Sequence, residues 1–127
     1  MALLRPALLL CLLLFAPAPS NAALFSSRSA VVHLDSNNFT PLVLSGRLPY
    51  VVLFYSPSCP HCSSVAPAYT QAADLLAKEG EGGVTLGVMD GNVNNDIVRH
   101  YKISGYPYVH SLSGDHFEMS LYACDGM

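Results

Sequence analysis

The chain has 127 residues, a formal net charge of −3 and an apolar fraction of 51%. This length fits a single domain with one hydrophobic core. The apolar fraction is too high for a disordered chain, and the negative charge excludes a protein that binds nucleic-acid phosphates through its net charge. Four cysteines are too few for a scaffold held together by disulfides.

The first 22 residues have the three parts of a secretory signal peptide. Arg5 supplies the positive charge, residues 7–16 form an unbroken apolar run, and small residues end at Ala22, where a signal peptidase would cut. A helix that crosses a bilayer needs roughly 20 apolar residues, so the run is too short. A membrane anchor and a buried helix are the alternatives, but two prolines after the run oppose a continuing helix. We therefore expect export, with no membrane span in the mature chain.

Two features precede the first long apolar run of the mature chain. Residues 23–30 are a polar lead-in without hydrophobic periodicity, and residues 31–127 are predicted to form the domain. Asn38 begins an Asn-Phe-Thr pattern that is an acceptor for N-glycosylation. The proline directly after this pattern disfavours its use, so glycosylation of Asn38 stays open.

Hydrophobic patterning predicts a β-α-β-α-β-α-β-β order. Strands are expected at residues 31–34, 50–55, 84–89, 108–110 and 117–122. Helices are expected from Asp35 or Ser36 to Gly46, from Cys59 to Gly80, and from Asn92 or Asn94 through Tyr101. Helical connections make the first three strands parallel, and a turn at residues 113–115 makes the last two antiparallel. The predicted fold class is α/β, with a mixed central sheet flanked by helices.

The sequence Cys59-Pro60-His61-Cys62 lies between a predicted buried strand and a helix. At a helix N-terminus, unpaired backbone N–H groups and the helix dipole favour a thiolate, so Cys59 is the candidate nucleophile. Cys62 lies one turn later, within reach to resolve a mixed disulfide. Pro60 fits the first helical turn because it has no N–H to leave unbonded. A protonated His61 would add positive charge beside the thiolate.

Redox chemistry competes with three alternatives for this cysteine pair. A zinc site needs four ligands, but no second paired Cys/His motif occurs and the other four histidines are scattered. A structural disulfide across two residues would be strained and would add little loop-closure entropy. The third alternative is two coincidental core cysteines. We expect redox function, with no metal and no cofactor, because no nucleotide or flavin pattern is present.

Residues 54–62, Phe-Tyr-Ser-Pro-Ser-Cys-Pro-His-Cys, and residues 66–69, Ala-Pro-Ala-Tyr, resemble the active site of the thioredoxin superfamily. The closest resemblance is to a protein disulfide isomerase domain. Residues 88–90, 101–103 and 105–107 are similar to that family's third strand, third helix and substrate-facing loop, in the same order and spacing. The resemblance covers nearly the whole mature chain.

The resemblance implies a thioredoxin-like fold and disulfide exchange with cysteine-containing folding proteins. It also implies the lumen of the endoplasmic reticulum or secretion, with glutathione or an upstream oxidase as redox partner. Cys59 would attack and Cys62 would resolve. Pro107 would form a cis peptide bond with Tyr106 and lie against the disulfide, leaving the Tyr106 backbone to pair with an extended substrate. The alternative for Tyr106 is a half-buried aromatic of the sheet.

The chain departs from the family pattern near the motif. Ser58 replaces a tryptophan before the first cysteine, and Leu53 replaces a buried acidic residue that moves protons for the resolving cysteine. No carboxylate lies nearby in the sequence, so deprotonation of Cys62 is expected to be slow and to rely on water or His61. Pro-His between the cysteines, as in the strongly oxidising bacterial periplasmic oxidase, favours oxidation over reduction.

The sequence stops at Met127, before the helix that follows the last strand in the family, which would leave one sheet face uncovered. Cys124 is interpreted as a strand-end residue, with an intermolecular disulfide as the alternative. Disulfide exchange is the leading hypothesis. The alternative function is a non-catalytic, chaperone-like or peptide-binding module that uses the Tyr-Pro loop and the exposed sheet.

Overall fold

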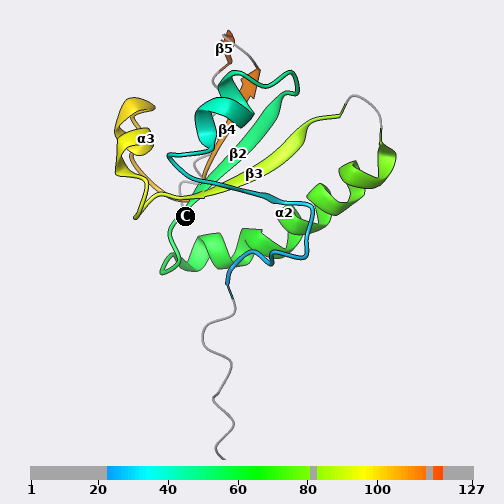
Figure 1. The fold of residues 1–127 in the computed structure, drawn as a ribbon. Coiled ribbons are helices and arrows are strands. Elements are labelled where there is room, and N and C mark those ends of the chain that lie inside the picture. Colours follow the sequence, from blue (N-terminus) through cyan, green and yellow to red (C-terminus); the bar gives the residue numbers. More distant parts are fainter. Residues whose placement is uncertain (1–22, 81–82, 114–115, 119–127) are drawn as a thin grey trace, which may run out of the picture.

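The computed structural model describes residues 23–80, 83–113 and 116–118. Its strands are Val32–Leu34 (β1), Tyr50–Tyr55 (β2), Thr85–Asp90 (β3), Tyr108–Ser113 (β4) and His116–Glu118 (β5). Its helices are Thr40–Leu44 (η1), Pro60–Glu79 (α2) and Asn95–His100 (α3) (Figure 1). The expected signal peptide, the centre of the last turn, the end of the last strand, Cys124 and the C-terminus lie outside the described residues.

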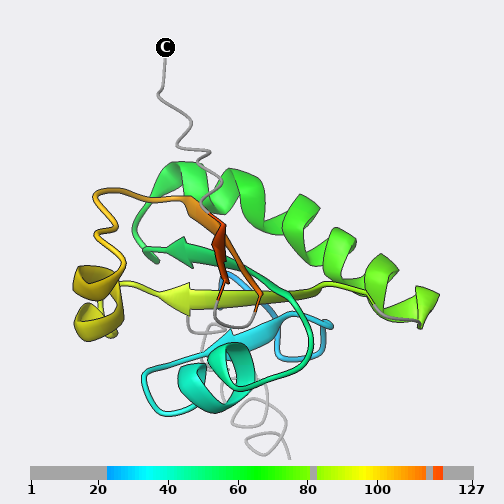
Figure 2. The ribbon, with the colours of Figure 1, turned by 90° about the horizontal axis from the view of Figure 1, so that it is seen from above.

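The five strands form one mixed sheet in the order β1-β3-β2-β4-β5. β3 runs parallel to β1 and β2, whereas β4 runs antiparallel to β2 and β5 (Figure 2). The parallel direction of the first three strands and the antiparallel pairing of the last two are as predicted, and the predicted α/β fold is confirmed. The strand order and the pairing of β4 with β2 were not predicted. In the β2–β3 register Tyr55 lies opposite Asp90, so the carboxyl ends of the two strands meet at one edge of the sheet.

Helices cover both faces of this sheet, with α2 on one face and η1 and α3 on the other (Figure 1). Successive side chains of β2 point to opposite faces. Val52 and Phe54 therefore pack in the cluster beneath η1 and α3, whereas Leu53 packs in the cluster against α2. All three are fully buried, and each contributes roughly 1.5–3 kcal/mol of hydrophobic stabilisation. Packing on both faces fixes the end of β2, from which the cysteine motif follows.

The helix α2 begins and ends close to its predicted limits. Pro60 lies in its first turn, and Gly80 ends it in the left-handed conformation, at φ 70°. Pro67 lies inside the helix and has no N–H to donate to the carbonyl of Ser63. Figure 1 shows the helix changing direction along its length.

The first predicted helix starts later and is shorter than expected. A turn precedes it, in which the Asp35 carboxylate accepts hydrogen bonds from the N–H groups of Asn37 and Asn38, at 2.7 and 3.0 Å. The helix η1 then has only five residues and a π-type pattern. Pro41 lies in the first turn of η1, where the N–H that a proline lacks would have no helical partner.

Asn94, one of the two predicted N-cap residues, is the N-cap of α3. Its side chain makes no capping hydrogen bond. Its Nδ2 donates to the Asp90 carbonyl at 2.8 Å, and its Oδ1 accepts from the Ser36 N–H at 3.0 Å. Asn94 therefore ties the end of β3 to the turn after β1. Val93, predicted on the apolar face of this helix, precedes the helix and is 75% exposed.

The segment 23–30, predicted as a polar lead-in, packs against the domain through one aromatic residue. Phe25 is 1% exposed, and its ring contacts Tyr55 and Tyr69 edge-on, with centroid distances of 5.0 and 6.2 Å. Figure 1 shows the segment, in blue, alongside α2. A single aromatic residue among serines produces no periodic pattern, so the sequence does not reveal this packing.

Asn38→Ala is expected to lower the free energy of unfolding by about 1–2 kcal/mol. Asn38 Nδ2, the atom that a glycan would modify, donates to the His33 carbonyl at 3.0 Å, and Oδ1 accepts from the Asp35 N–H at 2.8 Å. The substitution leaves both backbone groups without this partner. Urea unfolding followed by circular dichroism measures the loss. The matched control, Asn37→Ala at an exposed position, should cost less than about 0.5 kcal/mol. Equal losses would contradict the role of Asn38.

Candidate active site

Cys59 lies where the loop after β2 enters α2. It is the N-cap residue of that helix, with an extended backbone at φ −82° and ψ 118°. Its Sγ accepts a hydrogen bond from the Cys62 N–H at 3.3 Å, in the position that a capping oxygen usually takes. Both cysteines are free thiols; Cys59 is partly exposed and Cys62 is buried. The helix N-terminus therefore directs its N–H groups at the accessible sulfur.

The two thiols differ in how easily they ionise. A hydrogen bond from the Cys62 thiol is the largest cause that lowers the pKa of Cys59. Burial opposes it, and the backbone N–H groups of Cys62 and His61 lower the pKa further. Burial raises the pKa of Cys62 to about 11, and its hydrogen bond to Cys59 adds to that rise. Cys59 is therefore the thiol that ionises more readily near neutral pH, and Cys62 stays protonated.

The loop before β4 forms a second wall of the site. The Tyr106–Pro107 peptide bond is cis, as predicted, and the Tyr106 carbonyl accepts a hydrogen bond from Cys59 Sγ at 3.6 Å. The Tyr106 ring lies on Gly91, where a Cβ atom would collide with the phenol. The Tyr106 ring packs half-buried against the core while its backbone carbonyl faces the thiol, and pairing of that backbone with a substrate stays a prediction.

The structure brings the backbone of Tyr106 to Cys59, but it leaves the side chains of Pro60 and His61 exposed at the start of α2. The contact of His61 with Cys59 Sγ runs through its backbone N–H. That a protonated His61 ring adds positive charge beside the thiolate stays a prediction.

A polar network that the sequence does not single out lies beside the thiols. Ser56 Oγ lies 3.1 Å from Ser58 Oγ and accepts a hydrogen bond from Asn92 Nδ2 at 3.0 Å. The Asn92 N–H in turn donates to the Asp90 carboxylate at 2.8 Å. Ser56 and Ser58 follow β2, whereas Asp90 ends β3 and Asn92 follows it. Only the pairing of these two strands brings the four residues together. No local motif could have revealed the network.

Other chemistry is not apparent in the part of the chain that the structure describes. No group of three His, Cys, Asp or Glu side chains there could hold a metal ion. No helix among those residues is both long enough and apolar enough to cross a membrane. His110 is 1% exposed and stacks on Tyr108, and burial lowers its pKa. It is therefore a neutral histidine of the core.

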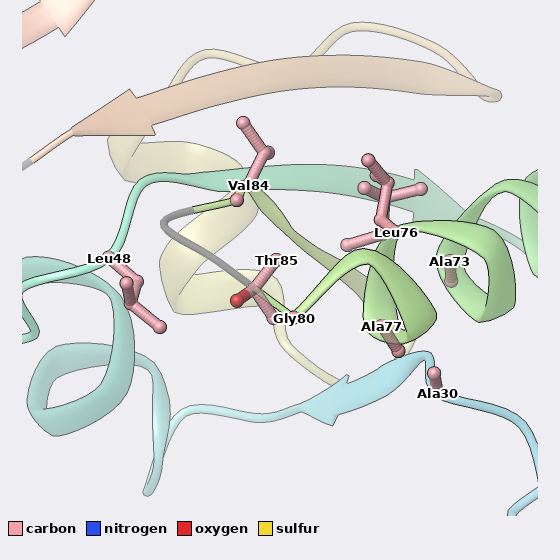
Figure 3. A pocket seen from close by; sticks show the side chains of 10 residues that line it. Ala30, Leu48, Ala73, Leu76, Ala77, Gly80, Val84 and Thr85 are labelled. Carbon is pink, nitrogen blue, oxygen red and sulfur yellow. The ribbon is translucent and has the colours of Figure 1, made fainter.

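A pocket of about 340 Å³ lies at the opposite end of α2 from the thiols. Figure 3 shows side chains from the end of α2, among them Leu76 and Ala77, together with Leu48 and Val84 from the segments before β2 and β3. No lining residue has a titratable side chain. This pocket therefore takes no part in thiol chemistry.

Comparison with known proteins agrees with this geometry. The family model described as thioredoxin matches residues 30–121. The chain belongs to the thioredoxin family. This thioredoxin domain is 32% identical over 109 residues to protein disulfide isomerase-like 2-3 of Oryza sativa subsp. japonica, covering 84% of the chain and 24% of that relative. It is 32% identical over 84 residues to protein disulfide-isomerase A6 of Homo sapiens, covering 66% of the chain and 19% of that relative.

Among solved structures, the thioredoxin domain is similar to the Trx4 domain of ERdj5, with a TM-score of 0.56 and 31% identity. That match covers 65% of the chain and 69% of the solved domain. The chain spans about a quarter of the length of the curated relatives it matches. These likenesses identify a protein disulfide isomerase-like thioredoxin domain of the thiol–disulfide oxidoreductase family.

Proposed function

We propose that this domain is a protein disulfide isomerase-like oxidoreductase that exchanges disulfides with cysteine-containing folding proteins through Cys59 and Cys62. The observation that carries this proposal is the asymmetry of the pair. One thiol is accessible and has a lowered pKa, whereas the other is buried and has a pKa of about 11. An attacking thiol and a resolving thiol require this difference, and a purely structural pair does not.

Oxidation of a substrate takes two exchange steps. In the first, a substrate thiolate attacks Cys59 Sγ of the oxidised pair, the Cys59–Cys62 bond breaks, and Cys62 leaves as a thiolate that takes up a proton. In the second, another substrate thiolate attacks the substrate sulfur of the mixed disulfide, and Cys59 leaves as a thiolate. Two electrons thus pass from the substrate to the cysteine pair. The lowered pKa of Cys59 makes it a good leaving group, which favours oxidation.

The Tyr106–Pro107 loop is the proposed docking site for the substrate backbone. The Tyr106 carbonyl faces Cys59 Sγ, so an extended segment that carries a cysteine to that sulfur passes directly along the loop. Once Cys59 is bonded to the substrate it has no proton to donate, and the Tyr106 carbonyl can accept a substrate N–H instead. The exposed residues Pro60 and His61 lie on the helix side of the same sulfur.

The secretory pathway is the proposed setting, with the lumen of the endoplasmic reticulum as compartment and glutathione or an upstream oxidase as partner. The signal-peptide pattern of the first 22 residues supports this setting. The sequence similarity to protein disulfide isomerases supports this setting as well. Disulfides form and persist in that compartment.

The reduction potential of the Cys59–Cys62 pair is expected to be about −200 mV or higher. This value is close to the reduction potential of the endoplasmic reticulum, roughly −180 to −210 mV. Stabilising the Cys59 thiolate stabilises the reduced pair and makes its disulfide more oxidising. Equilibration with glutathione buffers, followed by the mass shift after thiol alkylation, measures this potential. The Cys62→Ser variant is the control, because it cannot form the internal disulfide. A potential below about −300 mV would indicate a structural disulfide and would leave the non-catalytic, peptide-binding function.

A further inference from the structure

A short turn presents Cys59 at the start of α2. The Ser56 carbonyl accepts a hydrogen bond from the Cys59 N–H at 3.1 Å, which closes the turn over Pro57 and Ser58. Pro57 and Ser58 are exposed, so the middle of the turn gains little from packing. Ser56, the first residue of the turn, is 8% exposed. The position of Cys59 therefore depends on how Ser56 is held.

Asn92, which follows β3, holds the side chain of Ser56. Its Nδ2 donates to Ser56 Oγ at 3.0 Å, whereas the other neighbour of that oxygen, Ser58 Oγ at 3.1 Å, belongs to the turn itself. Asn92 is exposed, but its backbone is fixed on both sides. Its N–H donates to the Asp90 carboxylate at 2.8 Å, and its carbonyl accepts from Asn95 Nδ2 at 3.4 Å. The Asn92 amide is thus a fixed point that ties the turn to the end of β3.

The segment 90–92 also supports the other wall of the site. The Gly91 N–H donates to the Tyr55 carbonyl at 2.8 Å, directly before the turn. The Tyr106 ring lies on Gly91, where a Cβ atom would collide with the phenol. The Tyr106 carbonyl in turn accepts from Cys59 Sγ at 3.6 Å. One short segment therefore contacts both the turn that carries the thiol and the loop that faces it.

We propose that Asn92 is a positioning residue for disulfide exchange, which acts through its hydrogen bond to Ser56 and so fixes Cys59 at the start of α2. This inference rests on the proposed function. In that place the Cys59 sulfur accepts from the Cys62 N–H at 3.3 Å and faces the Tyr106 carbonyl, where the substrate segment is proposed to pass. Without the Asn92 amide the turn is free to shift, and the sulfur leaves these partners.

The expected consequence is a less stable thiolate at Cys59. Its pKa is lowered by the Cys62 thiol and, to a smaller extent, by the N–H groups of Cys62 and His61. All of these contacts require the sulfur to lie over the first turn of α2. A displaced Cys59 should therefore have a higher pKa, and its disulfide with Cys62 should be less oxidising.

The ionisable side chains of the elements that meet at Cys59 stay the same in the Asn92→Ala variant. They belong to β2, the start of α2, the end of β3 and the loop before β4: Tyr55, His61, Cys62, Asp90 and Tyr106. The Asp90 carboxylate also keeps its partner, because that N–H belongs to the backbone of residue 92. The substitution changes no charge, so a shift in the pKa of Cys59 reports a change in its position.

The test is the pH dependence of Cys59 alkylation in the reduced full chain. Iodoacetamide reacts with the thiolate, and peptide mass mapping assigns the reaction to Cys59, so the midpoint of the rate against pH gives the pKa of this thiol. In Asn92→Ala the midpoint should move to higher pH. The rate at about pH 6 should fall roughly threefold or more, the size expected when a hydrogen bond to the thiolate weakens. The exchange equilibrium with glutathione should shift toward the disulfide by a similar factor.

A second substitution separates this hydrogen bond from other effects of residue 92. Ser56→Ala removes the other partner of the bond and should move the midpoint in the same direction. Adding Asn92→Ala to it should cause no further shift, because the bond is already lost. Ser56→Thr keeps a hydroxyl and should retain the wild-type midpoint. Val93→Ala is the matched control and should also retain it, because it alters the neighbour of Asn92 at a position that is 75% exposed.

Three results would overturn the inference: an unchanged midpoint in Asn92→Ala, additive shifts in the double variant, or equal shifts in Ser56→Thr and Ser56→Ala. Circular dichroism and thermal unfolding establish that each variant is folded. A lower stability with an unchanged midpoint would make Asn92 a structural residue and not a positioning one. The proposed function fails separately, if the wild-type chain forms no mixed disulfide at Cys59 with glutathione disulfide. A wild-type chain that forms it, together with an unaltered midpoint in Asn92→Ala, would remove only the role of Asn92.

Discussion

Cys59→Ser is expected to abolish disulfide exchange, with the rate falling at least about 10³-fold, to the uncatalysed level. Cys59 is the more accessible thiol of the pair, and its pKa is lowered by the Cys62 thiol and by the N–H groups of the first helical turn. A serine hydroxyl in that place keeps the N-cap geometry but cannot form a disulfide. The measurement is oxidative refolding of a reduced, cysteine-containing protein in glutathione buffer.

Cys62→Ser should give a different result, because it spares the attacking thiol. Cys59 should still react, and the mixed disulfide should accumulate because nothing resolves it. The serine hydroxyl at position 62 can still donate a hydrogen bond to Cys59 Sγ, so this reaction should need no higher pH than in the wild type. Gln71→Ala, an exposed position on α2, is the control and should leave exchange unchanged. Exchange by Cys59→Ser, or no trapped species in Cys62→Ser, would contradict the proposed roles.

The part of the site that is local in the sequence was predictable, and the part that depends on register was not. Cys59 and Cys62 stand three residues apart, so helix geometry alone places them together. The nearness of Tyr106 to Cys59 followed only from the resemblance to the family. The network of Ser56, Asn92 and Asp90 was overlooked because the pairing of β2 with β3, and not nearness in the sequence, brings these residues together.

The same distinction applies to the fold. The strand Tyr50–Tyr55 was predicted with its observed limits because an unbroken apolar run is typical of a strand buried on both faces. Gly80 marked the end of α2 because a glycine readily takes the left-handed conformation that ends a helix. The turn before η1 and the packing of residues 23–30 were missed. The turn depends on the hydrogen bonds of one carboxylate with two N–H groups, and the packing depends on one phenylalanine. Single contacts of this kind produce no periodic pattern in the sequence.

Phe25→Ala is expected to lower the free energy of unfolding by about 3–5 kcal/mol, the range for emptying a buried phenylalanine site. Phe25 is 1% exposed and packs edge-on against Tyr55 and Tyr69. The Tyr69 hydroxyl lies 2.8 Å from the carbonyls of Val51 and Gly87, so it links β2 to β3 beneath this ring. Removing the Phe25 ring therefore opens a cavity above the central strands of the sheet. Urea unfolding, with the midpoint and slope fitted separately, measures the loss.

Ser27→Ala is the matched control, because it alters an exposed residue of the same segment and should change stability by less than about 0.5 kcal/mol. The segment is also attached by a 2.7 Å hydrogen bond from the Ala30 N–H to the Asp74 carboxylate, which Asp74→Asn tests. This variant should lose less free energy of unfolding than Phe25→Ala, because an amide oxygen can still accept that bond. A loss below about 1 kcal/mol in Phe25→Ala would mean that the segment does not pack on α2 in solution.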